Sequence, residues 1–135
     1  MITYDEFKKV EIRAGKILSA EKIPNTDKLL KLMVDFGEVE KAMGGVGDEA
    51  LVVASASNTT TISIPAPRQI VSGIALHFPD PSVLVGKTCM FVTNLEPRII
   101  CGYESNGMLF AVSTHEGGFS LLEPNETIPA GALAV

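Results

Sequence analysis

The residues of this chain that are able to do covalent or metal chemistry are few and scattered. Its two histidines, His77 and His115, lie in no recognisable nucleophile or metal-binding pattern. Cys89 and Cys101 lack the C-x-x-C spacing of metal and redox pairs. We therefore expect no catalysis, no metal and no cofactor, and we expect both cysteines to be reduced residues of the core or of strands.

Binding of an anionic partner is the chemistry that the cationic side chains offer, and they gather towards one end of the chain. Residues 1–41 hold eight Lys and Arg and eight acidic residues, whereas residues 42–135 hold three and eight. The net charge of −5 therefore falls entirely on the later part. This balance argues against indiscriminate nucleic-acid binding through bulk charge, and it places any anionic partner nearest the N-terminal third.

Length and composition are those of one folded domain, residues 1–135. A chain of 135 residues with 46% hydrophobic residues is long and apolar enough to bury a single core. The first residues, MITYDEFKKV, lack the basic start and apolar run of a secretion signal. No apolar stretch approaches the roughly 18 residues of a membrane span. We expect a cytoplasmic protein that does not enter a membrane.

The first elements follow from capping and periodicity. Thr3 and Glu6 have the spacing of a capping box, which predicts a short helix ending near Val10. Apolar residues then alternate as far as Ala14, which indicates a strand. The alternation slips at Gly15, and a glycine at such a slip predicts a β-bulge. After a turn at residues 24–27, Leu30–Phe36 alternate again and predict a second strand with Lys31 facing outward.

The later part of the chain contains many short strands. They are predicted over Gln69–Gly73, Lys87–Thr93, Arg98–Cys101, Met108–Ser113 and Phe119–Leu122, with a loop at His77–Val85 and a hairpin turn at His115. Residues 40–66 are predicted as an inserted loop holding a hairpin of Leu51–Ala56 with Thr60–Ile64, ended by Pro65. Short strands, Gly and Pro turns and one helix favour an all-β fold. We expect a five-stranded OB-fold barrel with a short N-terminal helix, an inserted hairpin and a C-terminal extension.

Three stretches, in order, resemble the tRNA-binding domain family. They are Val10–Ile17 followed by Pro24–Leu30, then Arg68–Ile74, then Asn94–Arg98 followed by Gly102 and Glu104–Met108. The family contains C-terminal domains of bacterial and archaeal methionyl-tRNA synthetases, free-standing tRNA-binding proteins and CsaA-like relatives. The resemblance covers nearly the whole chain except residues 40–66. It implies an OB-fold that binds tRNA by its shape and commonly forms a homodimer, either free-standing or with a methionyl-tRNA synthetase catalytic chain.

The resemblance and the residue types together select nine candidate tRNA contacts. They are Arg13, Lys28, Lys31, Arg68, Asn94, Arg98, Ser105, Asn106 and Met108. RNA shape is recognised through phosphates and 2′-hydroxyls, which suit Lys, Arg, Asn and Ser, and a methionine can pack against a base.

Plainer roles stay open for the same residues. The lysines and Arg13 suit a solvated surface, Arg68 suits an ion pair, the segment 105–107 suits a turn, and Met108 suits the core. Glu96 and Ile99–Cys101 stand where family members often carry basic residues. We therefore expect weak, salt-sensitive RNA binding.

Two other functions fit the same sequence. A CsaA-like protein-export chaperone would hold unfolded polypeptide in apolar grooves, and an exposed apolar patch would favour it. A dimerisation module would instead give a synthetase avidity for tRNA while binding RNA poorly alone.

Overall fold

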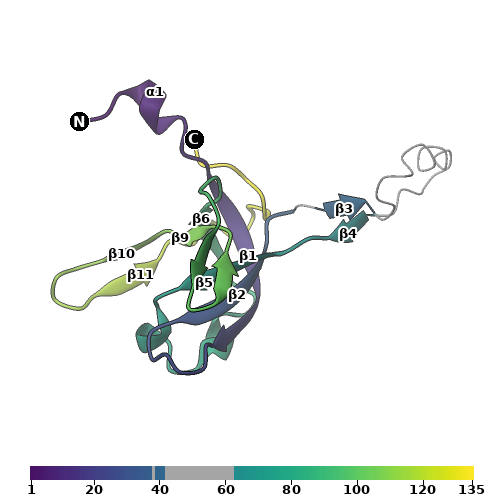
Figure 1. Ribbon diagram of the computed structural model, residues 1–135. Coiled ribbons are helices and arrows are strands. Elements are labelled where there is room, and N and C mark those ends of the chain that lie inside the picture. Colours follow the sequence, from purple (N-terminus) through teal and green to yellow (C-terminus); the bar gives the residue numbers. More distant parts are fainter. Residues whose placement is uncertain (38, 42–62) are drawn as a thin grey trace.

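The centre of the molecule is a five-stranded antiparallel sheet that curls into a nearly closed barrel (Figure 1). This computed structural model describes residues 1–37, 39–41 and 63–135. The strand order is β5-β2-β1-β6-β9. The strands are β1 (Ile12–Lys22), β2 (Leu30–Asp35), β5 (Arg68–Ser72), β6 (Thr88–Val92) and β9 (Met108–Leu109). The all-β class and the five-stranded OB-like barrel are confirmed.

Strand β1 is long enough to pair with two neighbours, its first half with β6 and its second half with β2. The β1–β2 register shifts between Ile17 and Ser19, so the predicted bulge at Gly15 is wrong. Gly15 pairs with β6 without a shift. A Cβ atom added there would lie 2.5 Å from Cε1 of Phe36. The glycine is needed because the barrel interior leaves no room for a side chain.

The core is built on the alternation of β2. Leu30, Leu32, Val34 and Phe36 are buried, as the period of two predicts. Phe91 of β6 meets the Phe36 ring edge-on, with ring centroids 5.3 Å apart. These side chains and those of the facing strands fill the barrel.

The connection between β5 and β6 contains two 3₁₀ helices where a plain loop was predicted. These are η1 (Ala75–His77) and η2 (Pro81–Leu84). The Asp80 carboxylate accepts the backbone N–H of Ser82 at 3.1 Å and caps η2, whose first residue is a proline. Leu84 is fully buried in the barrel core, which ties this connection to the strands.

Two hairpins extend the barrel: β7 (Arg98–Ile100) with β8 (Tyr103–Ser105), and β10 (Ala111–Ser113) with β11 (Phe119–Leu121). Strand β8 was not predicted. The strand predicted over Met108–Ser113 is broken at Phe110, because β9 pairs with β6 while β10 pairs with β11. His115 lies in the turn between β10 and β11, as predicted.

The two ends of the chain meet beside the start of β1. Helix α1 (Tyr4–Phe7) has the predicted capping box, but it ends before Val10. A short helix is marginal without packing, and its apolar residues face solvent. The C-terminal extension runs along β1, where the Ala14 N–H donates to the Ala132 carbonyl at 2.8 Å. Ala14 is therefore covered by the tail, while Gly15 faces the barrel.

The predicted insertion lies largely outside the described residues. Its described ends are β3 (Val39–Lys41) and β4 (Ser63–Pro65), which pair antiparallel. The predicted hairpin of Leu51–Ala56 with Thr60–Ile64 lies mostly outside the described residues. Its described residues Ser63 and Ile64 pair with Lys41 and Glu40, and β4 extends to Pro65, one residue beyond the predicted end.

The two cysteines differ. Cys89 is a buried strand residue, as predicted. Cys101 is exposed in the β7–β8 turn, so its prediction as a core or strand residue is wrong. In the part of the chain described, no helix has the length and apolar character needed to cross a membrane.

Candidate nucleic-acid interface

The β7–β8 hairpin carries Arg98 and stands between the fourth and fifth barrel strands, β6 and β9. Its turn residues Cys101 and Gly102 have φ of 50° and 85°. Two consecutive positive φ angles give a type I′ turn, whose twist matches that of a tight hairpin. Arg98 pairs with Ser105 across the ladder and is exposed. An OB-fold commonly uses this connection for binding.

The segment after β8 closes the barrel against β5. The Ser105 hydroxyl is buried, accepts the N–H of Val71 at 2.9 Å and donates to the Gly107 carbonyl at 3.1 Å. The Asn106 N–H donates to the Gln69 carbonyl at 2.9 Å. These bonds fix the hairpin beside β5. Residues 71–73, at the C-terminal end of β5, are called the outer end of β5. Ser105 therefore holds this segment, and its one proton is used within the protein.

Lys31 lies next to this hairpin. It pairs with Val71 across the β2–β5 ladder. Its side chain is half-buried between the buried residues Leu30 and Leu32, which agrees with the predicted outward-facing position. Its Nζ lies 3.2 Å from a carboxylate oxygen of Glu21 and 5.8 Å from the centre of the Tyr103 ring. The aromatic face and the carboxylate hold the ammonium group near β8.

A groove of about 220 Å³ runs between β5, the β6–β7 connection and β9. It is lined by Val71, Ser72, Gly73, Leu95, Glu96, Arg98, Ile100, Ser105, Gly107, Met108 and Leu109. Met108 is 46% exposed, so its alternative reading as a core residue is excluded. A Cβ added at Gly73 would lie 3.9 Å from the carbonyl oxygen of Lys28, so the Lys28 backbone lies close to Gly73.

Arg68 has an internal role at the start of β5. Its Nη1 donates to the carbonyls of Thr93, at 2.7 Å, and Asn106, at 3.3 Å, and its guanidinium lies 5.3 Å from the centre of the Phe36 ring. The side chain thus ties β5 to both ends of the connection that carries the hairpin.

Arg13 and Asn94 belong to a separate cluster near α1. The Asn94 carboxamide accepts the Glu11 N–H at 2.8 Å and donates to the Lys9 carbonyl. Arg13 donates to the Glu11 carboxylate at 3.1 Å. This bond, together with one from Thr93, holds the pKa of Glu11 below its ordinary value. The cluster fixes the N-terminal segment on the barrel.

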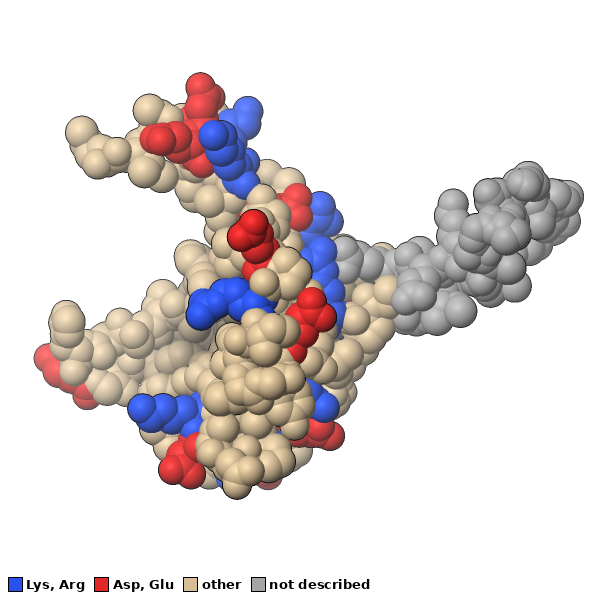
Figure 2. All heavy atoms as spheres, viewed as in Figure 1, with Lys and Arg blue, Asp and Glu red and all other residues tan. Residues whose placement is uncertain are grey.

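Eight of the nine candidates therefore fall into two groups. Lys28, Lys31, Arg98, Ser105 and Met108 lie around the outer end of β5, whereas Arg13, Arg68 and Asn94 hold the chain near the start of β1. Asn106 lies between the two groups, because it contacts both Arg68 and Gln69 at the beginning of β5. Figure 2 shows basic and acidic side chains interspersed on one face, with wide uncharged areas between them. No group of three or more His, Cys, Asp or Glu among the described residues is placed to hold a metal ion.

Sequence reasoning missed Tyr103 and Leu95. Tyr103 supports Lys31, and Leu95, which is 48% exposed, lines the groove. Leu95 stands inside the stretch Asn94–Arg98 that resembles the family, and Tyr103 is one of the few aromatic residues available for base stacking, but neither was selected among the nine candidates.

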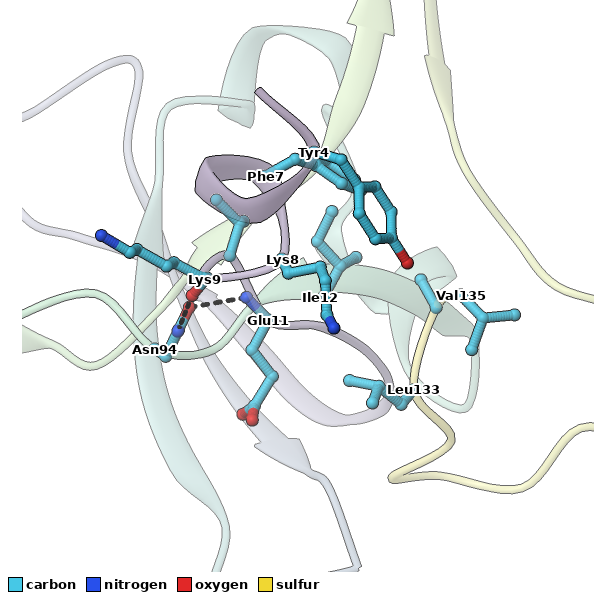
Figure 3. A pocket seen from close by; sticks show the side chains of 11 residues that line it. Tyr4, Phe7, Lys8, Lys9, Glu11, Ile12, Asn94, Leu133 and Val135 are labelled. Carbon is cyan, nitrogen blue, oxygen red and sulfur yellow. Dashed lines mark hydrogen bonds between the residues drawn. The ribbon is translucent and has the colours of Figure 1, made fainter. Parts of the chain in front are cut away.

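A second cavity, of about 340 Å³, lies between α1 and the C-terminal tail (Figure 3). Tyr4 and Phe7 line it from the helix, and Leu133 and Val135 line it from the tail. All four side chains are exposed to solvent, and even the least exposed of them, Phe7, is 49% exposed. This apolar surface, which we call the terminal patch, has no covering element among the described residues.

Comparison with protein families identifies a family for this chain. The family described as "Putative tRNA binding domain" matches residues 59–133. The methionine–tRNA ligase of Methanospirillum hungatei is 42% identical over 130 residues, 96% of this chain. That of Enterococcus faecalis is 32% identical over 131 residues, 97% of this chain. The chain spans only 15% of the length of the first relative and 16% of the second.

Solved structures agree with this match. A "MetRS related protein" of Pyrococcus horikoshii superposes with a TM-score of 0.76 at 35% identity, over 100% of this chain and 98% of that one. The chaperone CsaA of Bacillus anthracis superposes with a TM-score of 0.69 at 21% identity, over 100% and 99% of the two chains. The second likeness concerns the fold alone.

Proposed function

We propose that this chain, which belongs to the tRNA-binding domain family, binds tRNA through the surface around the outer end of β5. The protein is a tRNA-binding domain, and the resemblance noted in its sequence is confirmed. The observation that carries the proposed surface is that three cations stand on chain segments that meet beside β5: Lys31 pairs with Val71, the Lys28 carbonyl accepts the Ala75 N–H, and Arg98 lines the groove with Val71. Lys28 precedes β2, Lys31 lies on β2, and Arg98 lies on β7. Contacts with phosphates and 2′-hydroxyls need such dispersed donors.

The direct contacts we propose are Lys28, Lys31, Arg98, Asn106 and Met108. Arg13, Arg68, Asn94 and Ser105 would act as positioning residues, because the hydrogen bonds described above already engage their side chains. The Asn106 amide donates to the Gln69 carbonyl at 3.5 Å, so the contact we propose for Asn106 is through its carboxamide oxygen. The domain performs no chemistry of its own in this proposal and works in the cytoplasm, where it presents tRNA to other proteins.

Salt titration of tRNA binding tests this proposal. With about three phosphate contacts, the logarithm of the association constant should fall with the logarithm of salt concentration with a slope of about −2 to −3. Lys31→Ala and Arg98→Ala should each weaken binding and make the slope shallower by about one. Lys87→Ala is the matched control, because Lys87 pairs with Glu123 at 3.7 Å, outside the proposed surface. Equal slopes in all variants would reject this surface.

A partnership with methionyl-tRNA synthetase is the second part of the proposal. The curated relatives are methionine–tRNA ligases, and this chain matches only a small part of each. We propose that it supplies tRNA affinity to a synthetase catalytic chain, as a subunit or as a domain. Adding the protein to a catalytic chain that lacks such a domain should lower KM for tRNA and leave kcat unchanged. An unchanged KM would contradict the partnership.

We also propose that two copies associate through the terminal patch. An exposed apolar surface of this kind marks an interface, and self-association would double the number of tRNA-binding surfaces. Light scattering should give twice the 14.4 kDa mass of one chain. Phe7→Glu should reduce it to one chain, whereas Val112→Glu, at an equally exposed position on β10, should not. A parent protein that is monomeric at micromolar concentration would contradict the proposed association of two copies.

Polypeptide binding of the chaperone kind has one observation in its favour. Leu95 and Met108, which line the groove, are 48% and 46% exposed, and Ile99 on the other face of β7 is 69% exposed. The protein would then suppress aggregation of an unfolded protein, and tRNA would not compete. Competition by tRNA at low salt would favour the RNA function.

A further inference from the structure

The groove beside Met108 differs from the rest of the proposed RNA surface, because it is hollow and combines apolar with charged side chains. Val71, Leu95, Ile100, Met108 and Leu109 supply its apolar lining. Its volume of about 220 Å³ is far more than a single water molecule needs. A hollow of this size accepts a flat ring system and excludes a double helix.

Two charged side chains also line this groove. Within the described residues, neither Arg98 nor Glu96 forms an ion pair or a hydrogen bond through its side chain. Both residues are exposed, and Pro97 separates them in the chain. The groove therefore offers one anchor for an anion and one for hydrogen-bond donors, with apolar surface beside them.

A nucleotide has the complementary parts. Its phosphate pairs with a guanidinium, its base face packs on apolar side chains, and its base edge carries donors. Paired RNA hides its base edges in a deep, narrow major groove, so proteins read bases that are unstacked. The two tyrosines do not line this groove, which leaves the polarisable thioether of Met108 as its packing surface for a base.

We propose that this groove takes a single unpaired nucleotide of the bound tRNA, an inference that rests on the proposed function. The phosphate lies at Arg98 and the base packs on Met108. Glu96 accepts a hydrogen bond from an amino group of the base. An ionised carboxylate only accepts, so it favours adenine, cytosine or guanine, which carry amino groups, over uracil, whose single donor N3–H lies between two carbonyl oxygens that repel the carboxylate. Glu96 also repels phosphate, which fixes the direction in which the nucleotide enters.

RNA hairpins with and without one bulged nucleotide test this inference on the full chain. Fluorescence anisotropy should show about tenfold tighter binding of a bulged cytidine than of the uninterrupted duplex. A bulged uridine should bind several-fold more weakly than the cytidine. Glu96→Gln should remove that difference between the two bases, because the amide also donates.

Met108→Ala should abolish the preference for the bulge. Val112→Ala is the matched control, since Val112 is 50% exposed but lies on β10, outside the groove. Met108→Leu keeps the apolar volume and should retain most of the preference. Equal melting temperatures of the variants would show that each one is folded.

The remaining outcomes separate this inference from the proposed function. Salt-sensitive tRNA binding with equal affinity for bulged and uninterrupted hairpins would overturn the nucleotide groove and leave the tRNA surface standing. Absence of tRNA binding at low salt would remove both. An unfolded polypeptide that binds in a Met108-dependent way, with no preference for bulged RNA, would assign the groove to polypeptide instead.

Discussion

The hydroxyl oxygen of Ser105 accepts the backbone N–H of Val71 at 2.9 Å, across the edge of β5. The backbone N–H at this edge of the sheet thus finds its hydrogen-bond acceptor in a side chain, where a neighbouring strand would normally supply a carbonyl. The same hydroxyl donates to the Gly107 carbonyl, so one small residue links β5 to the segment that leads into β9. This link positions the β7–β8 hairpin and the groove together.

Ser105→Ala should destabilise the protein by about 1 to 3 kcal/mol, because it leaves the buried Val71 N–H without its acceptor. Urea unfolding followed by circular dichroism measures the change. Ser113→Ala, at an exposed position on β10, should change the free energy of unfolding by less than about 0.5 kcal/mol. Equal effects of the two substitutions would show that the Ser105 bond contributes nothing particular.

Gly15→Ala should also destabilise the fold, by about 1 to 3 kcal/mol, through overpacking. The new Cβ would lie 2.5 Å from Cε1 of Phe36 and 2.6 Å from Cγ1 of Val34, and both side chains are held in the core. Gly73→Ala is the comparison, because its Cβ would meet only the Lys28 carbonyl oxygen, at 3.9 Å. Thermal unfolding that ranks the two variants the other way would contradict the role given to Gly15.

The strands that follow a strict period of two were predictable, because alternation is a local property. Leu30–Phe36 is the clearest case. The phase slip at Gly15 was visible, but its cause was not. The sequence does not show that Ala14 is covered by a C-terminal tail more than 100 residues away, while its neighbour faces the barrel. In the sequence alone, a glycine that is required because no side chain fits cannot be distinguished from a glycine at a β-bulge.

The candidate site divides in the same way. The residue types and the resemblance selected Lys31 and Arg98, and the fold brings both to the outer end of β5. The partners of Arg68 and Ser105 were not predictable, because they are backbone groups that meet these side chains only in the folded chain. Tyr103 was missed for the same reason, since it meets Lys31 only when β8 lies beside β5.

Cys89 should make the stability of the protein depend on pH in the alkaline range. Burial, and secondarily the charge of Glu123, raises the pKa of the Cys89 thiol from 9.0 to about 11. The folded protein then holds this proton more tightly than the unfolded chain. Its contribution, about 2 to 3 kcal/mol, is complete below pH 9 and is lost as the pH rises towards 11.

Urea unfolding at pH 8 and pH 10.5 measures this dependence on Cys89. The loss of stability between the two values should be smaller in Cys89→Ala than in the parent protein, although the variant starts less stable. Cys101→Ala should show the same loss as the parent, because Cys101 is exposed. An identical loss in all three proteins would mean that another group is responsible.

Glu11 should give the opposite dependence, on the acid side. Its pKa is lowered by the hydrogen bond from Arg13 and then by that from Thr93, so the folded state favours the carboxylate. The stabilisation is present above pH 4.5 and is lost as the pH falls through the lowered pKa. Glu11→Gln keeps an acceptor for Thr93 but removes the charge. It should therefore unfold at a lower urea concentration than the parent at pH 7, and the difference should shrink at pH 3.

Glu126→Gln is the control for that experiment, since Glu126 is exposed and has no ion pair among the described residues. The midpoint of its urea unfolding should equal that of the parent at both pH values.

Because Glu11 also holds Thr93, beside the Asn94 that anchors the N-terminal segment, protonation of Glu11 should loosen α1 before the barrel unfolds. Hydrogen exchange at pH 4 should then rise first at residues 4–11. Uniform exchange across the barrel and α1 would show instead that Glu11 stabilises the fold only as a whole.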